Sequence, residues 1–181
     1  MRVIDCDHRH AATIREVFNE AIVHTTAIYD EEPRSEDNIH QWISAKQTNG
    51  YPIIGLESDA GELMGFASYG PFRPWAGYKH SIEHSVYVAA PYRGQGLGRR
   101  LLTLLIQSAT RDGFHTMIGG IDSGNVVSIS LHCSLGFTHC ANIREAGFKF
   151  NRWLDLHFYQ LILTDQASAA ALGLPARRAS E

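Results

Sequence analysis

The chain has 181 residues, a formal net charge of −3 and a hydrophobic share of 44%. These values are typical of a single globular domain with a buried core, and no apolar run is long enough to span a bilayer. Lysine and arginine never cluster beyond pairs, so we expect neither a nucleic acid nor a membrane as a partner.

The N-terminal part of the chain is predicted to form a strand followed by two helices. Residues 2–5 alternate as a short strand, and Asp7 is a good N-cap for the first helix. Apolar residues at helical spacing then form one stripe, which consists of Ile14, Val17, Phe18, Ala21 and Ile22. Ser35 is predicted to cap the second helix, which carries Ile39, Trp42, Ile43 and Lys46.

A β-hairpin and an aromatic loop are predicted next. The residue pattern favours strands over residues 52–57 and 63–69, with a turn at residues 59–61. Residues 71–80 place Phe, Trp and Tyr among Gly and Pro, which favours a lid or an interface. The next strand runs to Ala90 and leads directly into the most informative stretch of the chain.

Residues 91–100, Pro-Tyr-Arg-Gly-Gln-Gly-Leu-Gly-Arg-Arg, lie between this strand and a helix that ends near Asp112. The glycines are therefore predicted to form a turn from a strand into a helix. Glycine leaves the backbone N–H groups uncovered, and the start of a helix adds unpaired donors and a partial positive charge. Such a turn is typical of sites that bind phosphate oxygens.

Three interpretations of this turn compete when it is taken alone. A nucleotide-binding loop of the Walker type requires Gly-Lys-Ser/Thr at its end, where this chain has Gly98-Arg99-Arg100. A dinucleotide fingerprint requires its third glycine at position 99, although Asp122 would suit as the acidic ribose partner. A glycine-rich turn without any ligand is the third interpretation, and the arginines around the turn favour an anion over it.

The rest of the chain alternates strands and helices, which predicts a mixed sheet of the α/β (α+β) class. Strands are expected over residues 116–121, 138–145 and 153–163, with a short helix over residues 125–134. We assign residues 1–165 to one domain. Residues 166–181 are mainly small and charged, and we expect them to form a flexible tail.

Cysteine usage and the N-terminus indicate the cellular compartment. Cys6, Cys133 and Cys140 have no paired spacing, so we expect three buried thiols in a reducing cytoplasm. No Cys-x-x-Cys pair occurs, and we expect no metal; a zinc site from Cys133, Cys140 and nearby histidines is the weaker alternative. The N-terminal residues lack the apolar core of a signal peptide.

Two motifs together resemble those of the GNAT N-acetyltransferases. Residues 93–98, Arg-Gly-Gln-Gly-Leu-Gly, are similar to the family's Arg/Gln-x-x-Gly-x-Gly/Ala signature for the pyrophosphate of acetyl-CoA. Residues 125–137 resemble its second signature, Asn-x-x-Ser/Ala-x-x-Leu-aromatic followed by Gly-Phe. Residues 82–88 and 149–155 look most like the phosphinothricin and methionine sulfoximine acetyltransferase branch. The resemblance extends over residues 1–163 and implies a central sheet whose two middle strands splay apart.

The resemblance implies a set of contacts to acetyl-CoA. Backbone groups of Val86, Tyr87 and Val88 are expected to pair with the pantetheine amides, as an added strand would. Main-chain N–H groups of the glycine turn are expected to hold the pyrophosphate. The residues assigned to this turn are Arg93, Gly94, Gln95, Gly96, Leu97, Gly98 and Arg99. Asn125 and Ser128 complete the predicted cofactor site, and Asn125 suits a helix N-cap as well.

Glu83 and His132 are the predicted catalytic residues. Acetyl transfer to an amine needs a base for the amine proton and a way to stabilise the departing thiolate. Glu83 matches a carboxylate position of the family, and partial burial would raise its pKa toward neutrality. His132 stands where many of these enzymes have Tyr, and a histidine donates a proton near neutral pH. His84 points to the opposite face of a regular strand, so we assign it a structural role.

The acceptor site is predicted only from the segments that surround it in the resembling enzymes. The residues assigned to it are Tyr29, Arg73, Trp75, Tyr78, Lys149 and Phe150. A small amino acid carries a carboxylate, and either Arg73 or Lys149 would supply the cation that binds it. The resemblance also implies a homodimer with its sites near the interface.

Three functions follow from these observations. The first is N-acetylation of a small free amino acid or analogue, such as phosphinothricin or methionine sulfoximine, by direct attack in a ternary complex with acetyl-CoA. N-terminal acetylation of a peptide or protein is an alternative, but the aromatic loop favours a closed pocket. A CoA-binding protein without turnover is the third function, although the base and the phosphate-binding turn are both present.

Overall fold

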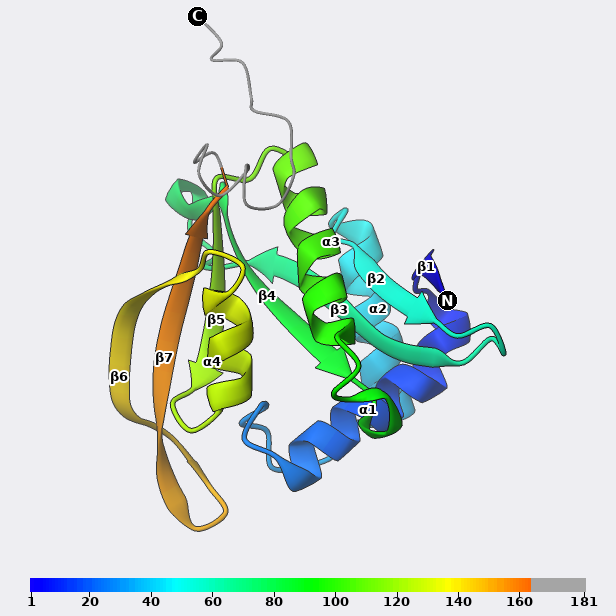
Figure 1. The fold of residues 1–181 in the computed structure, drawn as a ribbon, viewed down its shortest axis with the longest axis horizontal. Coiled ribbons are helices and arrows are strands. Elements are labelled where there is room, and N and C mark those ends of the chain that lie inside the picture. The colour runs from blue at the N-terminus through cyan, green and yellow to red at the C-terminus, as the bar shows by residue number, and fades with distance from the viewer. Residues whose placement is uncertain (164–181) are drawn as a thin grey trace, which may run out of the picture.

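The computed structural model describes residues 1–163, which form a mixed sheet of seven strands flanked by four α-helices (Figure 1). The strands lie in the order β1-β2-β3-β4-β5-β7-β6, and β4 and β5 are parallel. The strands are β1 (Arg2–Asp5), β2 (Ile53–Glu57), β3 (Leu63–Pro71), β4 (Ser81–Val88), β5 (Thr116–Asp122), β6 (Thr138–Lys149) and β7 (Arg152–Ile162). The helices are α1 (Ala11–His24), α2 (Glu36–Thr48), α3 (Leu97–Arg111) and α4 (Val126–Cys133).

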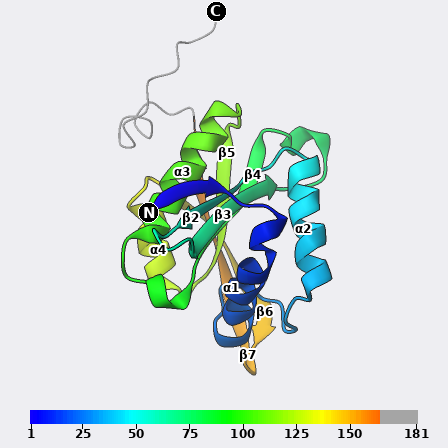
Figure 2. The same ribbon diagram turned by 90° about the vertical axis from the view of Figure 1, so that its right-hand side faces the viewer.

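Helices cover both faces of the sheet, and each face has its own core (Figure 2). α3 and α4 lie on one face, where Leu101, Leu105 and Ile82 are fully buried. α1 and α2 lie on the other face, where the rings of Phe18 and Phe66 pack edge to face with centroids 5.1 Å apart. Burial of apolar surface on both faces is the main stabilisation of the sheet.

The sheet parts between β4 and β5. β4 pairs with β3 along its length, but it pairs with β5 only through residues 81–83, opposite residues 116–118. Beyond Glu83 the two strands diverge toward their carboxyl ends (Figure 1), so their facing backbone edges have no strand partner across the gap. The predicted fold class, with its splayed mixed sheet, is therefore confirmed.

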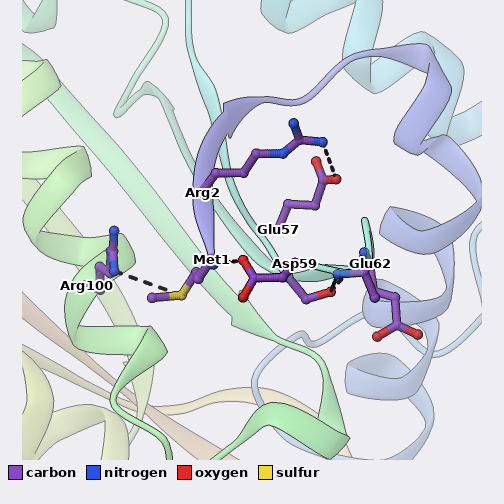
Figure 3. Close-up of polar contacts among 8 residues, drawn as sticks. Met1, Arg2, Glu57, Asp59, Glu62 and Arg100 are labelled. Atoms are coloured by element: carbon purple, nitrogen blue, oxygen red, sulfur yellow. Dashed lines mark hydrogen bonds and ion pairs between the residues drawn. The ribbon is translucent and has the colours of Figure 1, made fainter.

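The edge of the sheet at β1 is held by polar contacts near the N-terminus (Figure 3). Arg2 pairs with Glu57 of β2 at 2.7 Å, and the amino group of Met1 contacts the carboxylate of Asp59. The sulfur of Met1 also lies 4.0 Å from the guanidinium of Arg100 on α3. Pairs at the surface each contribute little to stability, and the register of β1 is set by its antiparallel pairing with β2 over residues 2–5.

Most predicted elements are confirmed, and the differences at their ends have local causes. Asp7 caps a turn of 3-10 helix over His8–His10, and α1 begins only after this turn. β6 continues past residue 145 to Lys149, because it pairs with β7 across a tight turn. In that turn Phe150 and Asn151 both adopt positive φ, a conformation that no sequence signal such as Asn-Gly announced.

The prediction of three buried thiols is wrong for two of them. Cys6 is buried, whereas Cys133 and Cys140 are exposed. Cys133 is the last residue of α4, and Cys140 lies at a register shift in the edge strand β6, so neither faces a core. Within residues 1–163 no helix is long and apolar enough to cross a membrane, and no cluster of side chains is placed to hold a metal. The predicted tail, residues 166–181, lies outside the described residues.

Candidate active site

The gap between β4 and β5 opens into a cavity of about 990 Å³. Its walls are the free edges of both strands, the glycine turn, α4 and the C-terminal end of α1. Most predicted catalytic and cofactor residues line it, namely Glu83, Val86, Tyr87, Val88, Arg93, Gly94, Gly96, Leu97, Gly98, Arg99, Asn125, Ser128 and His132. Gln95 does not, because its side chain turns back to the backbone O of Pro91 at 3.3 Å.

The glycine turn has the backbone conformation that the prediction required. Gly94 and Gly96 have φ of 76° and 78°, and no atom lies within 4 Å of the place where a side chain would begin. Gly96 is the N-cap of α3 and leaves the first N–H groups of that helix without a side-chain cap. The residues of this helix start line the cavity, and uncapped donors of this kind suit the oxygens of a diphosphate.

The arginine side chains around the turn already have partners within the protein. Arg93 forms a two-pronged ion pair with Glu20 of α1, and its Nε donates to the backbone O of Val88 at 3.1 Å. Arg99 donates to the Oγ of Ser134 at 2.7 Å. Both side chains therefore hold the turn against its neighbours. Their predicted part in cofactor binding then depends on their backbone N–H groups and on their charge.

Glu83 lies where the pairing of β4 with β5 ends. Its carboxylate lies over Gly120 of β5, where an added Cβ would be 3.2 Å from Oε1. Leu156 and Phe158 of β7 border the same place at 3.5 Å from that Cβ position. Burial raises the pKa of Glu83, and the nearby charge of Arg73 opposes this shift. A carboxylate with a raised pKa in a cavity has the properties of a general base.

Two adjacent glycines of β5, which sequence reasoning missed, make room for the predicted catalytic groups. A Cβ on Gly119 would lie 2.9 Å from the ring of His84 and 3.3 Å from the Nε2 of His132. Gly120, on the opposite face, lies beneath Glu83. A side chain at either position would displace one of these groups. Glycine inside a strand is a known sign of close approach, so the sequence carried a signal for this part of the site.

His84 and His132 are in direct contact. Their Nε2 atoms lie 2.9 Å apart, and both rings pack against Phe137 with centroids 5.3 and 5.1 Å away. Burial lowers the pKa of His132, and it lowers the pKa of His84 to about 3. His84 does point away from the face of Glu83, but it lines the cavity and belongs to the site.

Asn125 is the N-cap of α4, as one of its two interpretations predicted. Its Oδ1 accepts a hydrogen bond from the backbone N–H of Ser128 at 3.1 Å. Ser128 in turn lies one helical turn before His132, with its backbone O at 2.7 Å from the Nδ1 of that ring. The cap therefore orients the helix that carries His132. The contact of Asn125 with the cofactor stays a prediction.

Lys149 and Tyr29, two predicted acceptor residues, hold the loop that follows α1. The Nζ of Lys149 donates to the backbone O atoms of Thr25 and Ile28 at 3.0 and 2.6 Å. The hydroxyl of Tyr29 donates to the carboxylate of Asp122 at 3.3 Å. Together they fasten this loop to β5 and to the hairpin of β6 and β7. Within the described structure both polar groups are thus already bound.

The aromatic loop lies beside Glu83. The guanidinium of Arg73 stacks on the ring of Phe72 at 4.3 Å from its centroid, and its charge acts on the pKa of Glu83. Phe72 also contacts the rings of Tyr78 and Phe158, with centroids 5.8 and 6.3 Å away. The charge of Arg73 therefore reaches the predicted base, but neither Arg73 nor Tyr78 lines the main cavity. Their part in acceptor binding stays a prediction.

Trp75 and Phe150, the remaining predicted acceptor residues, lie on the surface. Their exposed fractions are 67% and 53%, which is high for aromatic side chains. Phe150 borders a second, smaller hollow next to residues 24–27 and Asn125, apart from Glu83. Like the other four predicted acceptor residues, these two do not line the main cavity.

Lys46 of α2 lines the main cavity, although the sequence suggested only a helix position for it. Its Nζ donates to the backbone O of Tyr69 at 2.7 Å and lies 3.1 Å from the place of a Cβ on Gly70, the β3 partner of Glu83. Burial lowers the pKa of Lys46 to about 8. Among the described residues no carboxylate forms an ion pair with it. Its place in an apolar helical stripe was the available sequence signal.

Known proteins are similar to this chain in fold and in sequence. The Acetyltransferase (GNAT) family model matches residues 14–137. An L-methionine sulfoximine/L-methionine sulfone acetyltransferase of Salmonella typhimurium is 44% identical over 171 residues, which are 94% of this chain and 99% of the relative. An acetyltransferase structure from Salmonella typhimurium with acetyl-CoA matches with a TM-score of 0.87 and 44% identity, and covers 92% and 95% of the two chains. A Sinorhizobium meliloti phosphinothricin acetyltransferase in complex with acetyl-CoA matches with a TM-score of 0.86 and 33% identity, and covers 89% and 87%.

Proposed function

The chain belongs to the GNAT acetyltransferase family, and we propose that it transfers the acetyl group of acetyl-CoA to the amino group of a small amino acid or analogue. Relatives named for methionine sulfoximine, methionine sulfone and phosphinothricin support this class of acceptor. The observation that carries the proposal is the position of Glu83. Its half-buried carboxylate shares one cavity with the uncapped N-terminus of α3.

The cofactor end of the cavity is proposed to bind acetyl-CoA through backbone groups. The first N–H groups of α3 and of the glycine turn would hold the diphosphate, because they are uncapped and lie at the positive end of the helix. The edge of β4 over residues 84–88 has no strand partner on the side of β5. It offers N–H and C=O groups to the two pantetheine amides.

Glu83 is proposed to act as the general base. Acetyl-CoA supplies an already activated thioester, so the protein contributes mainly by positioning and by proton transfer. The acceptor amine is protonated in water and has to lose a proton before its lone pair attacks. Glu83 takes that proton, directly or through one water molecule, and its raised pKa makes it a stronger base than an exposed carboxylate.

The acceptor carboxylate is proposed to lie between the cations that flank Glu83. Lys149 is less suited than predicted, since its ammonium group is bound to two backbone carbonyls. Arg73 is exposed and close enough to Glu83 to affect its pKa. Lys46 of α2 lines the cavity, with its Nζ beside Gly70, the β3 partner of Glu83. An α-amino acid held by its carboxylate at these cations would present its amine toward Glu83.

We further propose that the protein works as a homodimer in the cytoplasm. The exposed aromatic side chains of the 71–80 loop and of the hairpin of β6 and β7 support an interface with a second copy. Cys6, Cys133 and Cys140 are all free thiols, which supports a reducing compartment.

An assay of thiol release tests the acetyl transfer. The full chain is incubated with acetyl-CoA and a panel of small amino acids, analogues and short peptides, and the products are identified by mass spectrometry. We expect release of one CoA thiol per N-acetylated methionine sulfoximine, methionine sulfone or phosphinothricin, and little turnover of peptides. Turnover of peptides alone would assign the protein to the acetylation of protein N-termini. Binding of CoA without thiol release on any amine would show a binding protein.

A further inference from the structure

A row of three hydrogen bonds passes through His84 and His132. The Nδ1 of His84 lies 2.8 Å from the backbone O of Ile118, and the two Nε2 atoms lie 2.9 Å apart. The Nδ1 of His132 lies 2.7 Å from the backbone O of Ser128. Both ends of the row are carbonyl oxygens, which only accept hydrogen bonds. Each Nδ1 therefore needs a proton, and the contact between the Nε2 atoms needs another.

Two neutral imidazoles carry two protons, whereas this row uses three. The row is complete only when the pair holds one additional proton and a single positive charge. In the neutral pair the Nδ1 of His132 lacks its proton, and the Oγ of Ser128, at 3.4 Å, is placed to donate to it instead. The neutral pair therefore satisfies two of the three contacts of the row and relies on the Oγ of Ser128 for the third ring nitrogen, whereas the charged pair satisfies all three.

The surroundings of the pair keep it neutral until a charge appears in the cavity. Burial lowers the pKa of both histidines, and no carboxylate of the described residues is in contact with either ring. Glu83 lies on the other face of β4, and Asp122 of β5 is bound to Tyr29 and to a backbone N–H. On α3, Arg99 is bound to Ser134. A negative charge formed beside the buried rings would act strongly on their proton affinity.

We propose that His84 and His132 act as one proton-holding pair, in which His84 is a positioning residue that accepts the Nε2–H of His132. This inference rests on the proposed acetyl transfer and adds a role for a residue that the sequence suggested to be structural. Ile118 fixes the tautomer of His84, because its carbonyl requires a proton on Nδ1. The Nε2 of His84 is thereby kept as an acceptor.

The pair accounts for the second proton of the reaction. The C–N bond of the amide forms and the C–S bond of the thioester breaks, and the sulfur leaves with the electron pair. The acceptor ammonium loses two protons in this process. Glu83 takes the first and returns it to solvent, while the histidine pair takes the second and passes it to the thiolate. The products are the amide, the CoA thiol and one proton in solution.

Nitrogen NMR of the full chain labelled with ¹⁵N-histidine tests the proton count without turnover. We expect both rings of the pair to change together as the pH is lowered, with one shared pKa for the uptake of one proton. In His84→Phe the remaining signals of His132 should titrate at a different pH. His139→Asn, which removes a ring on the exposed strand β6, should leave the pair unchanged. Two rings that titrate independently would overturn the proposal.

Kinetics distinguish a positioning role from simple packing. His84→Phe keeps a ring but removes the acceptor, and we expect kcat to fall by about tenfold or more, with a shifted pH–rate profile. His84→Gln restores an acceptor oxygen, and kcat should recover to within about threefold of the unchanged protein. The KM for acetyl-CoA should stay within about twofold in both variants.

Thermal unfolding first shows which variants are folded. If His84→Phe does not fold, His84→Gln and the titration of the unchanged protein still test the pair. An unaltered pH–rate profile in folded His84→Phe, or a His84→Gln variant as slow as His84→Phe, would contradict the positioning role. Absence of thiol release by the unchanged protein would instead refute the acetyl transfer. The NMR titration measures the proton uptake of the pair independently of that result.

Discussion

The two ends of the cavity are built from different parts of the chain. At the proposed cofactor end, the site consists of backbone groups of residues 84–98, which are continuous in sequence. At the proposed acceptor end, side chains come from separate segments. Lys46 of α2 and Glu83 of β4 line the cavity, while Arg73 of the aromatic loop and Phe158 of β7 lie close to Glu83. A backbone site therefore survives many substitutions outside its own short motif. A side-chain site depends on the strand register that gathers its members.

The largest effect is expected at the acceptor end, from the substitution Glu83→Gln. The amide keeps the shape of the side chain but does not act as a base, so kcat should fall by about 10²–10⁴-fold. The KM for acetyl-CoA should stay nearly unchanged, because the cofactor end uses backbone groups. Steady-state kinetics on both substrates check this split, and an equal loss of cofactor affinity would contradict the separation of the two ends.

The pH dependence of the unchanged protein sharpens the same point. Burial raises the pKa of Glu83, so the base is lost as the pH falls through this raised value. The acid side of the kcat/KM profile should therefore fall at a higher pH than an exposed glutamate would give. The residual activity of Glu83→Gln should not show this decrease on the acid side of the profile.

The cofactor end is expected to respond to Gly96→Val. Gly96 has a φ of 78°, which costs a β-branched residue about 1–2 kcal/mol and should distort the turn. We expect acetyl-CoA to bind about tenfold more weakly, as measured by calorimetry. Gly77→Ala is the matched control, because Gly77 has open space and no positive φ. Unchanged cofactor affinity in Gly96→Val would count against the phosphate-binding turn.

A smaller effect, again at the acceptor end, is expected from Lys46→Met. The substitution removes a cation that has no carboxylate partner among residues 1–163, and the KM for the amino acid should rise by about fivefold. The lysine has a pKa of about 8, so acceptor binding by the unchanged protein should weaken as the pH rises through that value. Arg111→Met, at the far end of α3, is the control. If Lys46→Met and the control have the same KM for the amino acid, Lys46 does not bind the acceptor.

The smallest effect on activity is expected from Gly147→Ala in β6. An added Cβ there would lie 2.5 Å from the ring of Tyr29, which fastens the loop after α1. The clash should lower the free energy of unfolding by about 1–3 kcal/mol, because the ring has to move out of a packed position. Urea denaturation measures this change. A denaturation midpoint equal to that of the unchanged protein would show that the ring is free to move.

The sequence by itself determined the local conformation of the proposed cofactor end. Several features depend only on the local conformation of the backbone, so neighbouring residues are sufficient to predict them. They are the periodicity of the strands and helices, the helix caps at Ser35 and Asn125, and the glycines at positions 94 and 96. Glu83 was predicted as the base because the family resemblance places a carboxylate at that position of the strand before the glycine turn. The family resemblance carried the same information, and the structural comparisons confirm the fold that it implied.

Only the tertiary structure decided what surrounds the reacting groups. Three features join segments that are far apart in sequence. His84 contacts His132, Lys46 lines the same cavity as Glu83, and Lys149 donates to backbone carbonyls of the loop after α1. These contacts depend on where β4 and β5 cease to pair and on how the helices lie over the gap. Hydrophobic burial and strand register set that geometry through the whole sheet, and no local pattern of residues contains it.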